Sequence, residues 1–329
     1  MADRPRVFVT RRLPGVAPLA RLEEVATADV WEHARPPAAA EVTARAEGCT
    51  ALLPMLTERI DGALLDACPT VHTVANMAVG YDNIDVSAAT ERGVLVTNTP
   101  DVLTDTTADI AFALLLAAAR RVTEGERKVR AGEWGTWQPD WLLGRDVHGA
   151  TLGIVGPGRI GRAVARRAAG FDMRVLYSGR REVADFPGEY VSFEALLERS
   201  DFVSVHVPLT PETAGLFGAD VFRRMKPTAI FVNTARGGVV DQQALRDALV
   251  RGEIAAAGLD VTTPEPLPPD DPLLEAPNLV ITPHLGSATA QTREAMADLA
   301  VDALCSVFVG ERPRHLVNPD AWSHWRGRR

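Results

Sequence analysis

The 329-residue chain has few cysteines, few lysines and no long apolar run, and each shortage excludes a class of protein. Its three cysteines lie too far apart for a disulfide framework or a Cys-x-x-Cys metal clip, and we expect no metal. The longest strongly apolar run, Ile110–Ala119, is about half of the roughly 20 residues that a membrane-spanning helix needs. Lysine occurs only at Lys128 and Lys226, there is no basic run, and the net charge is −8. Binding to nucleic acid or to an anionic membrane is therefore not expected.

The composition is that of a folded protein, with 46% apolar and 24% charged residues. A chain of this length exceeds one ordinary hydrophobic core, so we expect two domains. The N-terminal residues lead directly into the strand-like Val7–Val9. We therefore expect no signal peptide and a cytoplasmic location.

Short apolar runs alternate with amphipathic stretches, which predicts parallel sheets covered by helices. In the first part of the chain the expected strands are Arg6–Thr10, Ala51–Pro54, Val71–Ala75 and Val94–Thr97. Helical patterns between them cover Ala39–Glu47 and Asp61–Ala67. The second part contains six expected strands, the count of a doubly wound sheet. They are Thr151–Val155, Arg174–Tyr177, Phe202–Val207, Ala229–Asn233, Ala256–Val261 and Leu279–Thr282.

One long helix is expected from Thr106 to about Arg130, apolar on nearly all sides in its first half. The loop after it is rich in tryptophan, which favours a surface for a partner; it contains Trp134, Trp137 and Trp141. A last helix is expected over Gln291–Val309, followed by a loose polar tail.

A glycine-rich turn, Gly156-Pro-Gly-Arg-Ile-Gly161, follows an expected strand and opens a helical run. Gly156 allows a tight turn, Gly158 lets the backbone approach a pyrophosphate, and Gly161 lets the helix pack closely on the strand. The helix N-terminus attracts phosphate charge. In this context the pattern predicts a dinucleotide site rather than a plain turn.

The next strand ends in Ser178-Gly-Arg180-Arg181, where a protein that binds NAD would place an acid for the ribose hydroxyl. Two guanidinium groups suit a 2′-phosphate instead, so NADP(H) is the preferred cofactor. The alternative is that both arginines are solvated and Glu182 serves the ribose, which would make NAD(H) the cofactor.

Three residue types that fit one reaction follow three successive strands of the second part: Arg236, Glu265 and His284. Ligands of such sheets bind beyond the carboxyl ends of the strands. Reduction of a 2-keto acid needs a cation for the carboxylate, which Arg236 supplies, and a proton donor. His284 is suited to give that proton because imidazole titrates near neutrality, and Glu265 would orient the ring and favour its charged form. Taken singly, Arg236 could form a surface ion pair, Glu265 could be a loop charge and His284 could be a core histidine. Because all three stand at consecutive strand ends, their combination favours catalysis.

The chain resembles the D-isomer-specific 2-hydroxyacid dehydrogenase family from about Val7 to Pro319. The resemblance is carried by Asn76–Asp85, Thr107–Leu116, the glycine turn, His206–Thr210, Met225–Gly237, Gly258–Val261 with Glu265-Pro266, and Thr282–Thr289. Within the family, Gly80-Tyr-Asp-Asn-Ile-Asp85 and the Ser178-Gly-Arg-Arg corner are most similar to glyoxylate/hydroxypyruvate reductases. Met77, where an aromatic residue is common, and the atypical Pro157 depart from the pattern.

The resemblance implies a role for each matching residue. Arg236, Glu265 and His284 would be catalytic, and the backbone amides of Val79 and Gly80 would hold the substrate carboxylate. The cofactor would be bound by Thr107, Gly156, Gly158, Arg159, Ile160, Gly161, Ser178, Arg180, Arg181, Pro208, Thr213, Thr234, Ala235, Asp260 and Gly286. Local explanations also exist for three of these, because Thr107 could cap a helix, Pro208 could end a strand and Asp260 could be a loop acid.

The remaining substrate candidates each have two equal interpretations. Met55 and Leu56 would wall the substrate pocket or belong to the core. Trp141 would reach toward a partner's active site or only pack in a dimer interface.

The resemblance also implies the fold and the assembly. We expect an α/β protein in which a Rossmann-type doubly wound parallel sheet, residues 100–287, is inserted into a smaller flavodoxin-like α/β domain, residues 1–99 plus 288–329. The 100–150 segment would form the interface of a homodimer.

The expected function is NADPH-preferring reduction of glyoxylate or hydroxypyruvate to glycolate or D-glycerate. One alternative is oxidation of phosphoglycerate, phosphite or another D-2-hydroxyacid with NAD. The other is a non-catalytic dinucleotide-sensing protein built on the same fold.

Overall fold

The computed structural model describes residues 4–326 of the chain. The chain divides into two compact units: unit 1 comprises Met1–Leu103 with Thr289–Arg329, and unit 2 comprises Thr104–Ala288. The expected domain boundaries, at 99/100 and 287/288, lie within a few residues of these divisions. Unit 2 is thus an insertion in the sequence of unit 1.

Unit 1 is built on a parallel sheet of five strands in the order β2-β1-β3-β4-β5, which is the order of flavodoxin-like sheets. Its strands are β1 (Arg6–Val9), β2 (Thr27–Val30), β3 (Ala51–Leu53), β4 (Thr73–Ala75) and β5 (Leu95–Thr97). Its helices are α1 (Ala17–Val25), α2 (Ala39–Ala46), α3 (Gly62–Ala67), α4 (Val86–Glu91), α11 (Ala290–Phe308) and α12 (Ala321–Arg326). The strands β1, β3, β4 and β5 and the helices α2, α3 and α11 confirm the predicted elements within one or two residues.

Unit 2 contains a parallel sheet of seven strands in the order β12-β11-β10-β9-β6-β7-β8. Its strands are β6 (Thr151–Val155), β7 (Arg174–Ser178), β8 (Glu189–Tyr190), β9 (Phe202–Val205), β10 (Ile230–Asn233), β11 (Ala256–Leu259) and β12 (Leu279–Ile281). Its helices are α5 (Thr104–Ala119), α6 (Val122–Arg130), α7 (Arg159–Ala169), α8 (Phe193–Arg199), α9 (Ala219–Arg224), α10 (Gln242–Arg251) and the 3-10 turns Gly237–Val239 and Pro272–Glu275. Because the first strand β6 lies between β7 and β9, the order reverses there, as in Rossmann-type sheets. The six predicted strands are confirmed.

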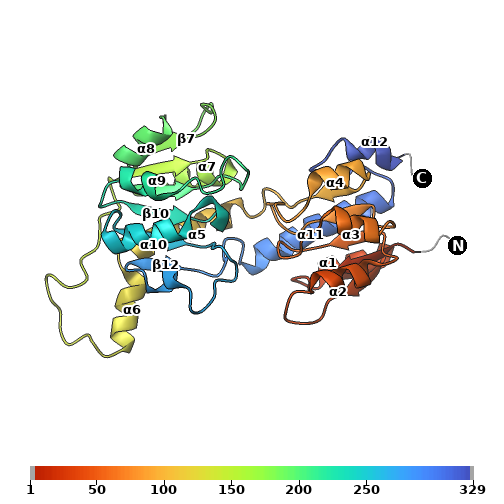
Figure 1. Ribbon diagram of the computed structural model, residues 1–329, viewed down its shortest axis with the longest axis horizontal. Coiled ribbons are helices and arrows are strands. Elements are labelled where there is room, and N and C mark those ends of the chain that lie inside the picture. The colour runs from red at the N-terminus through yellow and green to blue at the C-terminus, as the bar shows by residue number, and fades with distance from the viewer. Residues whose placement is uncertain (1–3, 327–329) are drawn as a thin grey trace. The chain divides into compact units, whose positions relative to one another are not determined.

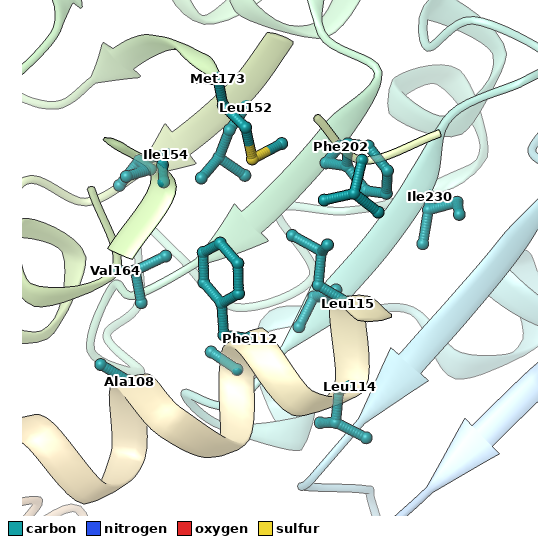
Figure 2. Packing of buried hydrophobic residues seen from close by; sticks show 14 of the residues in the cluster. Ala108, Phe112, Leu114, Leu115, Leu152, Ile154, Val164, Met173, Phe202 and Ile230 are labelled. Atoms are coloured by element: carbon teal, nitrogen blue, oxygen red, sulfur yellow. The ribbon is translucent and has the colours of Figure 1, made fainter. Parts of the chain in front are cut away.

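Both faces of the unit 2 sheet are covered, which explains why its strands are apolar without alternation. One face packs against α5 and α7, and the other against α8, α9 and α10. Figure 2 shows Phe112 and Leu115 pointing from α5 toward Leu152 and Phe202 of β6 and β9. The strands are therefore held rigidly between layers, and the loops at their carboxyl ends are carried by a fixed frame.

The expected long helix is two helices, α5 and α6, and the prediction of one continuous helix is wrong. Arg121 takes a left-handed conformation with φ 52°, which breaks the helix although no glycine or proline marks the site. The backbone N–H of Arg145 donates to the carbonyl of Ala119 at 2.8 Å, so the returning chain takes an acceptor that a longer helix would have used. Figure 1 shows the segment after α6, in yellow, looping away from the sheet of unit 2.

Two strands, β2 and β8, and three helices of unit 1, α1, α4 and α12, were not among the elements predicted by residue range. β2 and β8 are edge strands with exposed or half-buried residues and carry no apolar signal. The predicted loose tail is wrong for α12, where Trp322 and Trp325 are buried against unit 1. Residues 327–329, which the prediction also covered, lie outside the described part of the chain.

Candidate active site

The glycine turn connects β6 to α7 at the point where the strand order reverses. Gly156 has φ +101°, and a side chain there would lie 2.7 Å from the carbonyl oxygen of His206 in the loop after β9. A side chain at Gly161 would lie 2.3 Å from the Gly156 carbonyl, so both positions require glycine. At Gly158 a Cβ would meet no atom within 4 Å, and no side chain caps α7 there. The N-terminus of α7, formed by Arg159 and Ile160, is thus open to an anion such as a pyrophosphate.

The arginine corner follows β7 directly. Ser178 is buried, whereas Arg180 and Arg181 are exposed and form no ion pair with any residue of 4–326. Pro157 packs on this corner: a Cβ at Gly179 would lie 2.6 Å from its ring. The corner therefore presents two guanidinium groups beside the glycine turn, which suits a 2′-phosphate. Glu182 is also exposed.

Arg180 lies close to the loop after β9. A hydrogen bond with the Thr210 side chain lowers the pKa of the Glu212 carboxyl, and the positive charge of Arg180 adds to the effect. In the same loop Thr213 donates to the carbonyl of Pro208 at 2.6 Å, so its hydroxyl closes the turn. The loops after β7 and β9 thus flank the glycine turn on both sides.

The chain after β10 carries Thr234, Ala235 and Arg236. The buried Asn233 side chain accepts from the Ala235 N–H at 2.9 Å and donates to the Arg236 carbonyl at 2.9 Å, which fixes this turn. The Thr234 hydroxyl is buried and has no hydrogen-bond partner in the described residues. An orphaned hydroxyl at a strand end is a group that a bound ligand could satisfy.

The chain after β11 contains Asp260, which is 1% exposed. Its carboxylate accepts hydrogen bonds from the Thr282 hydroxyl at 2.6 Å and from the backbone N–H groups of Leu285 and Gly286 at 2.7 and 2.8 Å. Thr107 of α5 donates to the Gly286 carbonyl at 3.2 Å. Thr107 lies inside α5, which begins at Thr104, so the interpretation of Thr107 as a helix cap is wrong.

These contacts hold the loop that carries His284. The His284 N–H donates to the carbonyl of Asp260 at 2.9 Å, and its φ of +55° is a left-handed conformation that side chains rarely adopt. Strained residues of this kind occur at functional sites when the surrounding structure holds them. Here Asp260 does so through its carboxylate and its carbonyl.

Glu265 and His284 form a direct pair. The Nδ1 atom of His284 lies 2.5 Å from Oε1 of Glu265, and both side chains are partly open, at 25% and 34% exposed. Because a carboxylate only accepts, Nδ1 is the donor and Nε2 is left for a substrate. The turn that carries Arg236 packs tightly against the chain after β11. A Cβ at Gly237, the next residue, would lie 2.0 Å from the carbonyl oxygen of Thr262. The three predicted catalytic residues thus stand at the ends of the adjacent strands β10, β11 and β12.

The substrate candidates Met55, Val79 and Gly80 lie in unit 1, at the carboxyl ends of β3 and β4. They are half-buried, and Leu56 is 39% exposed, so the alternative that Leu56 belongs to the core is wrong. In unit 2 the tryptophan loop is largely open: Trp134 and Trp137 are 61% and 78% exposed, and Trp141 is half-buried.

Several residues that shape this site were not predicted, namely Asn233, Gly237 and Thr282. Asn233 and Thr282 act through backbone and carboxylate contacts that no spacing reveals. Within residues 4–326, no group of three or more His, Cys, Asp or Glu side chains is placed to bind a metal. The same part of the chain has no helix that is both long and apolar enough to span a membrane.

Comparison with known proteins gives consistent matches. A family model described as D-isomer specific 2-hydroxyacid dehydrogenase, NAD binding domain, matches residues 112–286. A glyoxylate reductase of Korarchaeum cryptofilum is 55% identical over 324 residues, covering 96% of this chain and 97% of that protein. A crystal structure of a Thermus thermophilus protein is 50% identical, with a TM-score of 0.90, covering 95% of this chain and 99% of that one. The NADPH-dependent glyoxylate/hydroxypyruvate reductase of Sinorhizobium meliloti, solved with NADP and malonate, is 37% identical with a TM-score of 0.86, covering 97% and 98%.

Proposed function

The chain belongs to the D-isomer specific 2-hydroxyacid dehydrogenase family, and we propose that it is an NADPH-preferring reductase of glyoxylate and hydroxypyruvate. As a family member it is an oxidoreductase that uses a nicotinamide dinucleotide. The products would be glycolate and D-glycerate. The proposal of glyoxylate as a substrate is supported by the name of the Korarchaeum relative, and that of hydroxypyruvate by the name of the Sinorhizobium enzyme.

The observation that carries the chemistry is the Glu265–His284 pair, in which Glu265 follows β11 and His284 follows β12. The next strand of the sheet after β11 is β10, and Arg236 follows its end. The hydride for the carbonyl carbon of the keto acid would come from the reduced nicotinamide of a bound cofactor. Arg236 binds the substrate carboxylate and polarises the carbonyl. His284 gives the proton on Nε2 to the carbonyl oxygen, and Glu265, 2.5 Å from Nδ1, keeps the ring oriented. In unit 1, the N–H groups of Val79 and Gly80 bind the substrate carboxylate.

The residues of unit 2 suit the cofactor that this reaction needs. The open N-terminus of α7 at Gly158 would hold the pyrophosphate, and the unpartnered hydroxyl of Thr234 would face the bound molecule. Of the other cofactor candidates, Arg159 begins α7, Ala235 follows Thr234, and Gly286 lies in the loop after β12. Asp260 would accept from the nicotinamide amide with the lone pairs that its loop contacts leave.

The test of the proposed reaction is the loss of absorbance at the nicotinamide band when glyoxylate, hydroxypyruvate or pyruvate is added with NADPH or NADH. We expect turnover with the first two keto acids. His284→Ala should lower kcat by about 10²–10⁴-fold, the usual worth of a positioned general acid, with cofactor affinity nearly kept. No oxidation of either cofactor by any short 2-keto acid would overturn the proposal.

The preference for NADPH rests on Arg180 and Arg181, which are exposed and unpaired within residues 4–326. Replacing both by glutamine should raise the KM for NADPH at least about tenfold, because charge-assisted contacts to a phosphate are worth roughly 1.5–3 kcal/mol each. The KM for NADH should stay within about twofold. The matched control replaces Arg223 and Arg224 of α9, which removes the same charge elsewhere on unit 2. Equal losses with both cofactors would show that the corner does not bind the 2′-phosphate.

We also propose that a second copy of the chain covers the 100–150 segment. Trp134, Trp137 and Leu143 are 61%, 78% and 66% exposed, and Val122 and Val129 of α6 are more than half exposed. Single exposed apolar residues are ordinary, but five on one short segment favour a partner. Sedimentation equilibrium should give twice the chain mass, and Trp137→Ser should shift it toward one chain. A monomeric wild-type protein at micromolar concentration would refute the homodimer.

A further inference from the structure

The motif Gly80–Asp85 places one side chain, that of Asn83, among three oxygen atoms of unit 1. Its Nδ2 atom donates to the carbonyls of Met55 and Glu58, both at 3.0 Å, and lies 3.5 Å from Oδ1 of Asn76. An amide carries two N–H hydrogens, so the two carbonyls take the short bonds and the third contact is weaker. Asn83 is half-buried, and its backbone carbonyl accepts from the N–H of Ile60 at 2.9 Å.

The same loop is held from its other side by Glu58. This carboxylate is 3% exposed, and its Oε2 accepts from the backbone N–H of Met55 at 2.9 Å and from the Thr10 hydroxyl at 2.5 Å. Its Oε1 accepts from the Thr57 hydroxyl at 2.5 Å and lies 3.3 Å from the Arg11 guanidinium. Both polar backbone atoms of Met55 are therefore bound by side chains, the N–H by Glu58 and the carbonyl by Asn83.

Asn83 also reaches the loop after β4. Asn76 is fully buried, and its Nδ2 donates to the carbonyl of Gly80 at 2.9 Å. The Oδ1 atom of the same Asn76 amide faces Asn83, while its N–H₂ group faces Gly80. The N–H of Met77 donates to the Pro54 carbonyl at 3.0 Å, which ties the two loops together at their bases. One side chain thus connects the Met55 loop with the Gly80 loop.

We propose that Asn83 is a positioning residue that sets the spacing of the two loops that bind the keto acid in unit 1. The inference rests on the proposed function, in which Val79 and Gly80 hold the substrate carboxylate and Met55 walls the pocket. The three neighbours of Nδ2 are all acceptors, so the position requires a neutral donor. An aspartate of the same shape would turn lone pairs toward the carbonyls of Met55 and Glu58.

The test compares Asn83→Ala and Asn83→Asp with a matched control, Asn318→Ala. Asn318 is a buried asparagine of unit 1 whose Nδ2 donates to the Val94 carbonyl at 2.8 Å and whose Oδ1 accepts from the Val96 N–H at 2.8 Å. It supports the sheet just before and within β5, away from the Met55 and Gly80 loops. Both alanine variants should lose stability to urea, and only the Asn83 variants should alter the substrate site.

We expect the KM for glyoxylate to rise about 10–100-fold in both Asn83 variants, the cost of a misplacement of about 1 Å. The KM for NADPH should stay within about twofold. Binding of oxamate, an inert analogue of a 2-keto acid, should weaken by the same factor as the KM rises. The control should keep both values at the wild-type level.

Unchanged glyoxylate KM in folded Asn83→Ala and Asn83→Asp would overturn the inference, and so would an equal rise in Asn318→Ala. A wild-type chain that turns over no keto acid would refute the proposed function instead. Oxamate binding would then still decide between Asn83 and the control, because it needs no turnover.

Discussion

The contact between Gly237 and the chain after β11 gives a sharp test of how the proposed catalytic residues are brought together. In Gly237→Ala the new Cβ would lie 2.0 Å from the carbonyl oxygen and 2.2 Å from the carbonyl carbon of Thr262. Ordinary contacts of this kind lie beyond about 3.4 Å, near the carbon–carbon optimum of roughly 3.5–4.0 Å. The neighbours are backbone atoms, so the clash cannot be relieved by a side-chain rotation. The two strand ends must separate by about 1 Å or more.

The displacement acts directly on the proposed site, because Arg236 precedes Gly237 and Glu265 follows Thr262 by three positions. A misplacement of about 1 Å costs about 10²-fold in rate, and overpacking of a tight contact costs about 1–3 kcal/mol in stability. We therefore expect kcat/KM for glyoxylate to fall about 100-fold while the KM for NADPH changes little.

The assay is steady-state oxidation of NADPH together with urea unfolding of the variant. Gly170→Ala is the control, because a Cβ there would lie 3.4 Å from its nearest neighbour and its backbone is helical. If Gly237→Ala keeps kcat/KM within twofold of the wild type, the turn after β10 does not set the position of Arg236. The reasoning from close packing would then be refuted.

Three further predictions concern the frame of unit 2. Phe112→Ala should lower the free energy of unfolding by about 3–5 kcal/mol, because the ring fills the core between α5 and the sheet; urea unfolding measures this. Burial lowers the pKa of His206 to about 3, so its neutral form is favoured on folding and stability is lost as the pH falls below about 6.5. Between pH 7 and 5 the free energy of unfolding of the wild type should fall by about 2 kcal/mol more than that of His206→Asn, at about 1.36 kcal/mol per pH unit. Urea unfolding at both pH values measures the difference, and equal losses in the two proteins would contradict the assignment to His206. The Tyr177 hydroxyl accepts from the N–H of Val183 at 3.1 Å and donates to its carbonyl at 3.2 Å, and these two bonds hold the chain that follows the arginine corner. Tyr177→Phe removes both bonds. The KM for NADPH should therefore rise about fivefold per lost bond relative to the KM for NADH.

The strands that sequence analysis predicted and those that it missed differ in burial. The central strands are apolar because both faces are covered, and such runs stand out from their surroundings. β2, with the sequence Thr-Ala-Asp-Val, lies at a sheet edge and needs no apolar pattern to pair with β1. The break between α5 and α6 was missed for a related reason: a hydrogen bond from Arg145, distant in sequence, ends the helix at Ala119.

The tail after residue 309 was misjudged from its composition. Its end is rich in polar residues, but Trp322 and Trp325 lie three positions apart and so share one face of a helix. Their indole rings stack with centroids 5.0 Å apart and pack in the core of unit 1. The three-residue spacing of the two tryptophans, taken as helical periodicity, would have predicted α12.

The proposed catalytic side chains could be predicted from the sequence, whereas the side chains that position them could not. The placement of Arg236, Glu265 and His284 after three adjacent strands could be predicted because strand ends of a parallel sheet share one edge, whatever the intervening loops do. Asn233 and Asn83 could not, because asparagine in a turn is common and its hydrogen-bond partners lie wherever the chain returns. Under the proposed function, the same three residues on a chain without these amides would therefore be expected to bind the substrate less well, with the chemistry intact and its geometry loosened. The specificity of such a chain would then be set by residues that touch neither substrate nor cofactor, which is why comparing catalytic residues alone cannot predict it.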